Sequence, residues 1–319
     1  MLTYLKLFRW SNLLVVLLTM VLFRYTIVVP ILNEFGLKPE MTTLEFSLLV
    51  LATLLISAAG YAINDYFDLR IDRINKPDKI LLGRLIPRRK AIFYHSLFNI
   101  LALLIGLYLA YAVHRWQLVF IFLVIPALLW LYSIRYKRKF LAGNLIVAAL
   151  SAFVVAIVWV FDAHMLIAHK KMDPNAWIAI NYFVRVYALF AFFIGIIREI
   201  IKDAEDLEGD RITGCRTIPV VAGIKNTTNL ITFLIFGSIL VVAFFQVWFW
   251  KRELYLLPFY LLAGIQIPFL VMFIKSMKAK TKNDFSQLSR WAKLIMITGV
   301  STMFLFYYYF GHTDFLNWF

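Results

Sequence analysis

The acidic residues of this chain gather in two short windows. Of 18 acidic residues, ten lie within residues 65–78 and 199–210. Both windows contain the pattern D-x-x-D-x-x-x-D. Its members are Asp65, Asp68 and Asp72 in the first window and Asp203, Asp206 and Asp210 in the second. Offsets of 0, 3 and 7 place side chains on one face of an α-helix. We therefore predict that each window presents its three carboxylates from a single helical face.

Six carboxylates brought close together repel one another and raise each other's pKa unless a cation neutralises them. Mg²⁺ is such a cation, because it takes one or two carboxylates and often completes its shell with water and substrate phosphate. Basic residues that suit phosphate oxygens are interleaved with the acids: Arg70, Arg73, Lys76, Arg198, Lys202 and Arg211. One acidic cluster alone is usually a solvated helix end, but two clusters with identical spacing favour a metal-bridged diphosphate site.

The elements that carry these windows are predicted to be membrane helices. The chain of 319 residues is 62% hydrophobic and only 16% charged, with a mean hydropathy of +0.79. Apolar runs of about twenty residues recur along it, which indicates an all-α integral membrane protein. The nine predicted spans are 13–32, 44–63, 92–112, 117–134, 143–161, 177–198, 228–249, 254–274 and 292–310. The first run is too long for a signal-peptide core and is predicted to be retained.

The net charge of +15 is explained by membrane topology, so no nucleic-acid partner is expected. With the N-terminus in the cytoplasm, 25 of the 33 Lys and Arg residues fall on inner segments and six on outer ones. This split predicts a cytoplasmic N-terminus and an external C-terminus. Arg24, toward the outer end of the first span, is expected to snorkel to the interface. Cys215 is the single cysteine, which excludes an intrachain disulfide.

The two acidic windows occupy equivalent places in the predicted topology. One follows the second span and the other follows the sixth, so both are predicted on the cytoplasmic face. The chain therefore reads as one domain, 1–319, with two four-helix pseudo-repeats at about 1–140 and 141–275. A ninth helix follows at about 292–310. Two related halves commonly place a shared site at their interface.

At these residues the sequence resembles the UbiA superfamily of intramembrane prenyltransferases. The stretch 64–72 matches its N-D-x-x-D-x-x-x-D motif, and 203–210 matches its second motif. Further matches are Arg9, Asn12, Gly83-Arg84, Tyr132-Ser133, Lys137-Arg138, Gly143-Asn144 and Arg216-Thr217-Ile218-Pro219. The resemblance implies nine transmembrane helices around a central cavity, and a prenyl diphosphate donor whose apolar tail runs from the two acidic clusters into the membrane.

The resemblance also implies roles for individual residues. Mg²⁺ would be held by Asn64, Asp65, Asp68, Asp72, Asp203, Asp206 and Asp210, with Asp65 either a ligand or a support for the others. Catalysis would rest on Asp68, Asp72, Asp203, Asp206 and Asp210. The diphosphate would be bound by Arg9, Arg73, Lys76, Lys137, Arg198 and Lys202. The acceptor pocket would include Asn12, His95 and Asn144. For His95, a hydrogen bond between helices is the competing interpretation.

The second window is most similar to family members that attach a geranylgeranyl group to the hydroxyl of a lipid such as geranylgeranylglyceryl phosphate. The loop 78–84 departs from the R-P-I-P-S-G-like string of those relatives. Prenylation of an aromatic acceptor, as in quinone biosynthesis, therefore remains an alternative. A membrane transporter is a more distant alternative, because a transport site is expected near the bilayer midplane and not at the ends of spans.

Overall fold

The computed structural model describes residues 2–169, 171 and 173–312. Within these residues, nine helical segments are long and apolar enough to cross a membrane, which confirms the predicted span count. The helices are α1 (Leu2–Leu7), α2 (Trp10–Leu22), α3 (Val29–Glu34), α4 (Thr43–Asn75), α5 (Arg88–Ala112), α6 (Val119–Ile134), α7 (Ala142–Ala168), α8 (Pro174–Glu205), α9 (Leu207–Ile212), α10 (Ile218–Trp250), α11 (Leu256–Leu261), α12 (Ile267–Lys278) and α13 (Lys282–Phe310). Two π-helical segments, Phe23–Val28 and Leu262–Gln266, join α2 to α3 and α11 to α12. Short 3₁₀ turns lie at Pro77–Lys79, Trp116–Leu118 and Tyr136–Arg138.

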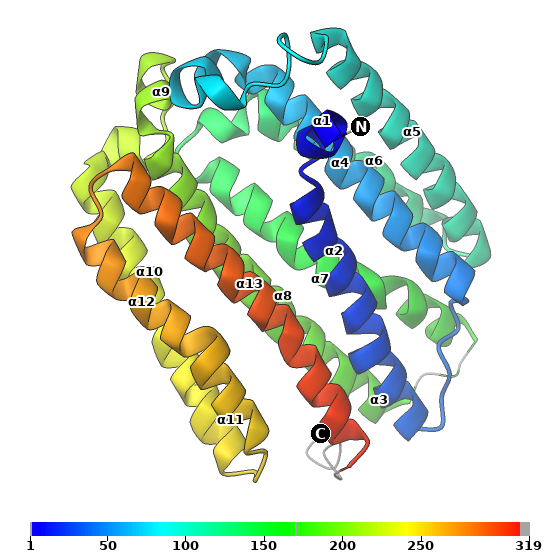
Figure 1. Cartoon of the computed structure of the whole chain (residues 1–319). Coiled ribbons are helices and arrows are strands. Elements are labelled where there is room, and N and C mark those ends of the chain that lie inside the picture. Colours follow the sequence, from blue (N-terminus) through cyan, green and yellow to red (C-terminus); the bar gives the residue numbers. More distant parts are fainter. Residues whose placement is uncertain (1, 170, 172, 313–319) are drawn as a thin grey trace.

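Local sequence signals set where several helices begin. Thr42 and Glu45 form a capping box at the start of α4, and Thr281 and Asp284 form another at the start of α13. The Asp173 side chain accepts hydrogen bonds from the first turn of α8. Such caps satisfy backbone N–H groups that have no partner within the helix. The long helices run side by side. The C-terminal ends of α4 and α8, where the acidic windows lie, are at the same end of the molecule (Figure 1).

Helix α4 continues well beyond the predicted second span. It remains helical through Asn75, so Asp65, Asp68 and Asp72 belong to the same helix that crosses the membrane. All three carboxylates line one cavity, as the spacing predicted. The polar end of this helix is thus held in place by the packing of its apolar part.

The second window does not form a continuous helix, which corrects our prediction. Helix α8 ends at Glu205, and Asp206 has φ −99° and ψ 9° before α9 begins at Leu207. Asp203 therefore lies on α8, whereas Asp210 lies on α9. The Asn75 side chain of α4 forms hydrogen bonds with the backbone at this break. Helical periodicity contains no information about such a contact from a distant segment.

Arg24 does not snorkel, so that expectation was wrong. It is 3% exposed and pairs with Asp162 of α7, which is fully buried. Arg24 also donates to the carbonyl of Met41 at 2.5 Å, and the Met41 N–H donates to Asp162 at 2.9 Å. The guanidinium lies over the ring of Phe46, 4.6 Å from its centroid. Because its partner lies 138 residues further along the chain, local sequence could not indicate the pair.

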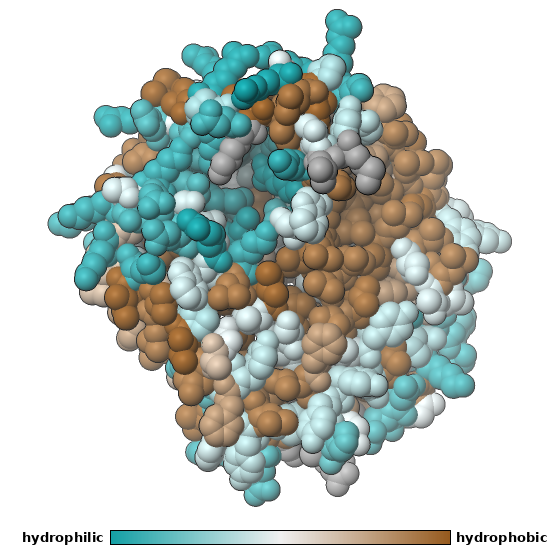
Figure 2. All heavy atoms as spheres, viewed as in Figure 1, coloured by the Kyte–Doolittle hydropathy of each residue, from teal (hydrophilic) through white to brown (hydrophobic). Residues whose placement is uncertain are grey.

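The surface is divided by polarity. Figure 2 shows hydrophilic side chains gathered around a hollow at one end of the molecule, with broad hydrophobic areas along its sides. Exposed aromatic and aliphatic side chains on α5, α6 and α10 contribute to the apolar sides. This distribution suits a protein whose flanks face lipid and whose polar end faces water.

Candidate active site

A cavity of about 930 Å³ lies between the helices and contains both acidic windows at its polar end. Among the described side chains, eight acidic ones line it: Asp65, Asp68, Asp72, Asp78, Glu199, Asp203, Asp206 and Asp210. The basic side chains that line it, within the same described part of the chain, are Lys6, Arg9, Lys76, Arg84, Lys137, Arg198, Lys202 and Lys293. The rest of its lining is mostly apolar and includes Val16, Ile56, Phe122, Leu150, Phe190 and Val300. The predicted apolar continuation from the two acidic clusters is therefore present.

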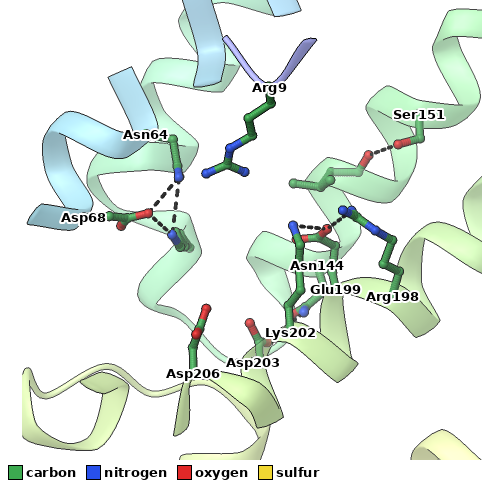
Figure 3. A network of polar contacts seen from close by, with 12 residues as sticks. Arg9, Asn64, Asp68, Asn144, Ser151, Arg198, Glu199, Lys202, Asp203 and Asp206 are labelled. Atoms are coloured by element: carbon green, nitrogen blue, oxygen red, sulfur yellow. Dashed lines mark hydrogen bonds and ion pairs between the residues drawn. The ribbon is translucent and has the colours of Figure 1, made fainter. Parts of the chain in front are cut away.

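The first wall of the polar end is formed by α4. Asn64 donates to Asp68 at 2.7 Å, and Lys137 forms an ion pair with the same carboxylate (Figure 3). Arg9 donates to Asp65 at 2.7 Å. Burial disfavours the charged form of Lys137, but the adjacent Asp68 carboxylate outweighs it and raises the pKa of Lys137. The lysine therefore stays charged beside the first motif.

The second wall is formed by α8. Asn144 of α7 donates to Asp203 at 2.8 Å. Glu199, one turn before Asp203, is 7% exposed and accepts hydrogen bonds from Lys202 at 2.9 Å and Arg198 at 3.0 Å. Figure 3 shows this group across an open space from Asn64 and Asp68, with Arg9 extending between the two. Each buried carboxylate of this wall thus has a hydrogen-bond donor, which lowers the cost of its burial.

Asn75 joins the two acidic windows. Its amide donates to the Asp206 carbonyl and accepts from the Gly209 N–H, both at 2.9 Å. Lys76 follows it and pairs with the Asp206 carboxylate, with Nζ 2.7 Å from Oδ1. A Cβ at Gly209 would lie 2.5 Å from Asn75 Nδ2, so only glycine leaves room for this contact. The end of α4 thereby fixes the α8–α9 break.

Asp210 is placed by α9 and by the start of α10. Thr217 donates to its carboxylate at 3.1 Å, and only 5% of the residue is exposed. Burial raises the pKa of Asp210 to about 6, while the Thr217 hydrogen bond acts in the opposite direction. A nearby cation would favour the charged form of this carboxyl.

Most of the predicted site residues line the cavity. These are all six motif aspartates with Asn64, the basic residues Arg9, Lys76, Lys137, Arg198 and Lys202, and Asn12. Arg73 does not: it is exposed and lies outside the cavity lining, because its offset from Asp72 turns it to another face of α4.

Two residues predicted for the acceptor pocket also lie outside the lining. His95 is buried, and its Nδ1 lies 3.1 Å from the Ala59 carbonyl of the neighbouring α4, so it bonds between helices. Asn144 is buried and holds Asp203. Sequence reasoning assigned no role to Glu199, Asn75 or Lys293. The position of Glu199 four residues before Asp203, on the same helical face, was a usable signal.

The donor set fits Mg²⁺ held jointly with a ligand. Carboxylate and amide oxygens are the hard ligands that this ion takes. Among the described residues, no group of three or more His, Cys, Asp or Glu side chains is close enough to hold a metal ion alone. The aspartates instead lie on two walls of the cavity, which basic side chains also line. An ion here would draw part of its shell from a bound anion.

A polar end rich in oxygen ligands and cations, above an apolar interior between membrane helices, defines a membrane protein with a site for an amphiphilic anion. The comparison with known families agrees with this class. Residues 35–294 match the UbiA prenyltransferase family, and the chain belongs to that family. The resemblance drawn from the motifs is thereby confirmed.

Individual relatives give a similar picture. Digeranylgeranylglyceryl phosphate synthase of Methanopyrus kandleri is 34% identical over 169 residues, which cover 53% of this chain and 54% of the relative. The match thus spans about half the length of that relative. The synthase of the same name from Sulfurisphaera tokodaii is 29% identical over 272 residues, covering 84% of this chain and 86% of the relative.

A solved structure shares the fold. The UbiA homolog from Archaeoglobus fulgidus bound to DMAPP and Mg²⁺ superposes with a TM-score of 0.53 over 94% of this chain and 99% of that one, at 17% identity. At this identity the likeness establishes the fold alone.

Proposed function

We propose that this protein transfers a polyprenyl group, geranylgeranyl by preference, from its diphosphate to the hydroxyl of a lipid such as geranylgeranylglyceryl phosphate, in a Mg²⁺-dependent reaction. One observation carries the proposal: the six aspartates of two matching motifs, 131 residues or more apart in sequence, line one end of a single amphiphilic cavity. The family and the names of the relatives support the same reaction class.

The chemistry follows from charge. Bound Mg²⁺, held by Asn64, Asp65, Asp68, Asp72, Asp203, Asp206 and Asp210, would supply Lewis-acid neutralisation of the diphosphate. Arg9, Lys76, Lys137, Arg198 and Lys202 bind its remaining oxygens. The allylic C–O bond breaks, and its electron pair leaves with the diphosphate. The acceptor oxygen forms the new bond to that carbon, and its proton passes to the departing diphosphate.

The apolar interior has two tasks in this reaction. It holds the prenyl tail, whose burial removes apolar surface from water. It also keeps water away from the allylic carbon while positive charge develops there. Side chains such as Phe122, Leu150 and Phe190 line this part of the cavity and suit both tasks.

We also propose the orientation in the membrane. The 25 to 6 division of Lys and Arg supports a cytoplasmic N-terminus and active site, with the C-terminus outside. The equivalent places of the two motifs, at the ends of the second and sixth spans, support two pseudo-repeats at about 1–140 and 141–275 within one domain. Cysteine-labelling reporters at Asp78 and Lys280 should react only from the cytoplasmic side, and a reporter at Lys171 only from outside.

The test of function offers the purified protein geranylgeranyl diphosphate with one acceptor at a time. We expect Mg²⁺-dependent ether formation on geranylgeranylglyceryl phosphate, and loss of product when the metal is chelated. An aromatic quinone precursor serves as the competing acceptor, because the loop 78–84 departs from the pattern of the lipid-prenylating relatives. Preferential prenylation of the aromatic ring would replace the lipid assignment but retain the reaction class.

A further inference from the structure

Lys293 is a cation of the cavity that the proposed diphosphate site does not use. Lys293 of α13 lines the cavity, and its Nζ donates to Ser11 Oγ of α2 at 2.9 Å. Among the described residues no carboxylate pairs with it, in contrast to Arg9, Lys76, Lys137 and Lys202. Arg198 also differs from Lys293, because it forms an ion pair with Glu199.

Two other lining cations, Lys6 and Arg84, also lack an ion pair among the described residues, but both are exposed to water. Lys293 is only partly exposed. A charged side chain on a membrane helix is costly unless it has a counter-charge or a functional partner. In the described part of the chain, the only hydrogen-bond partner of the Lys293 amine is the neutral hydroxyl of Ser11. Lys293 is therefore the lining cation that most needs an anion.

The wall that carries Lys293 is free of acidic side chains. Helix α2 contains no acidic residue. The acidic residue of α13, Asp284, accepts hydrogen bonds from Thr281 in the capping box at the exposed start of that helix. Asn12 of α2 adds an amide to the cavity lining, and Ser11, which lies outside that lining, accepts the hydrogen bond from Lys293 Nζ. The α4 and α8 walls, in contrast, carry the aspartates.

This division matters because the proposed reaction brings two phosphate groups into one cavity. Mg²⁺ held by the aspartates would let the donor diphosphate approach these walls, because it would neutralise the like charges. A phosphate monoester that is not bound to metal would be repelled by those walls. It needs direct N–H and O–H donors and a cation, which form strong charge-assisted hydrogen bonds with phosphate oxygens.

We propose that Lys293, positioned by Ser11, forms with Asn12 a second anion subsite that binds the phosphate monoester of the lipid acceptor. The subsite holds this phosphate at the wall formed by α2 and α13 and so orients the acceptor hydroxyl toward the donor. The inference rests on the proposed function, since it requires an acceptor that carries a phosphate.

The apolar surface next to the subsite supports this assignment. Met296, Val300 and Met303 follow Lys293 along one face of α13 and line the same cavity. Val15 and Val16 of α2, a helix that contacts α13, also line the cavity. A lipid whose phosphate sits at Lys293 therefore has an apolar surface for its own chain, next to the space for the donor's tail.

The test compares acceptors with and without the phosphate. Wild type, Lys293→Met, Lys293→Arg and the control Lys275→Met are purified in detergent and supplied with Mg²⁺ and saturating geranylgeranyl diphosphate. Lys275 is a matched control, because it is an exposed lysine near the C-terminal end of α12, and among the described residues its side chain donates a hydrogen bond only to Gln287. Geranylgeranylglyceryl phosphate and the same glycerol ether lacking phosphate are each titrated, and KM for the donor is measured separately.

We expect Lys293→Met to raise KM for the phosphate-bearing acceptor about 10- to 100-fold, as for loss of a hydrogen bond to a charged group. The dephosphorylated acceptor should show the same KM with wild type and with this variant. KM for the donor should stay within about twofold, Lys293→Arg should retain most of the affinity, and Lys275→Met should match wild type.

Two results would overturn the subsite while leaving the proposed function intact. One is an unchanged KM for the phosphate-bearing acceptor in Lys293→Met. The other is an increase in the donor KM, or an equal increase for both acceptors, which would assign Lys293 to the diphosphate or to general packing. Absence of wild-type transfer to either lipid acceptor, with transfer to an aromatic one, would instead refute the lipid assignment and the subsite together.

Discussion

The polar end of the cavity and the Arg24–Asp162 pair near the other end of the helices both place charges inside a membrane protein, yet they differ in exposure. The side chains of Arg9 and Asp65 are 34% and 21% exposed, whereas those of Arg24 and Asp162 are 3% and 0% exposed. The first pair lines the cavity, and the second does not. Water and a ligand can therefore reach one pair but not the other.

The two regions also differ in how fully their hydrogen bonds are satisfied. Arg24, Asp162 and the backbone of Met41 bond one another in a closed group. In the cavity, basic side chains form ion pairs with carboxylates. A metal ion could replace the basic side chains at these carboxylates, and a diphosphate could replace the carboxylates at the basic side chains. A charge within a membrane helix suggests function by default. This comparison adds that accessible, exchangeable pairs belong to a site, while a closed and buried group holds helices together.

The largest effect that separates the two regions is expected in folding. Arg24→Met leaves the Asp162 carboxylate buried without its counter-charge, which should destabilise the protein by roughly 3–5 kcal/mol. Unfolding titrated with SDS in mixed micelles measures this. The double variant Arg24→Met/Asp162→Asn should recover much of the loss, because no buried charge remains. Folded Arg24→Met should keep near-normal KM for the donor; a large KM change would place the pair in the functional region.

The next effect is expected in catalysis. Asp68→Asn and Asp206→Asn each remove one charge from facing walls of the cavity, and each should lower turnover by about 10²-fold or more. The double variant should lose less than the product of the two effects, since residues that act as a unit are not additive. Mg²⁺-dependent prenyl transfer by folded, purified variants measures both.

Stability should change less at this site than at Arg24. Asp68→Asn and Asp206→Asn each lose an ion pair, with Lys137 and Lys76 respectively, but each also relieves repulsion among crowded carboxylates in the metal-free protein, so the unfolding midpoint should shift only slightly. Near-normal turnover in either single variant would show that its acidic window is only a solvated helix end.

A smaller effect is expected where α4 fixes the α8–α9 break. Asn75→Asp keeps an acceptor for the Gly209 N–H but loses the donor to the Asp206 carbonyl, and it places a carboxylate against that oxygen. We expect about a tenfold loss of turnover, together with a higher Mg²⁺ concentration for half-maximal activity. A Mg²⁺ titration separates this from a purely structural defect, which would lower the amount of folded protein without shifting the Mg²⁺ requirement.

The smallest effect is expected at Arg73, which the structure places outside the cavity. Arg73→Gln should change turnover and donor KM by no more than about twofold. Lys76→Gln, three residues later, removes the cation that pairs with Asp206 and should raise donor KM by more. Steady-state kinetics on the two variants side by side would contradict the placement if Arg73→Gln had the larger effect.

The amino-acid sequence by itself determined the helical class, the nine spans found among the described residues and most of the predicted residues that line the cavity. These depend on hydropathy and on spacing within a few helical turns, which are local properties. The offsets of Asp65, Asp68 and Asp72 were sufficient to predict one face of α4, because that segment does form a single helix. The motif residues also sufficed to identify the family, which the match over residues 35–294 confirms.

Only the tertiary structure decided which residues meet. Three contacts join segments that are far apart in the chain. They are the hydrogen bond of Asn75 to Asp206 at the break after α8, the Arg24–Asp162 pair, and the contact of Lys293 with Ser11. The exclusion of Arg73 and His95 from the cavity likewise depends on the rotation and packing of α4 and α5. Such contacts are set by how helices pack against one another, and a pattern that repeats every 3.6 residues contains no information about the partner helix.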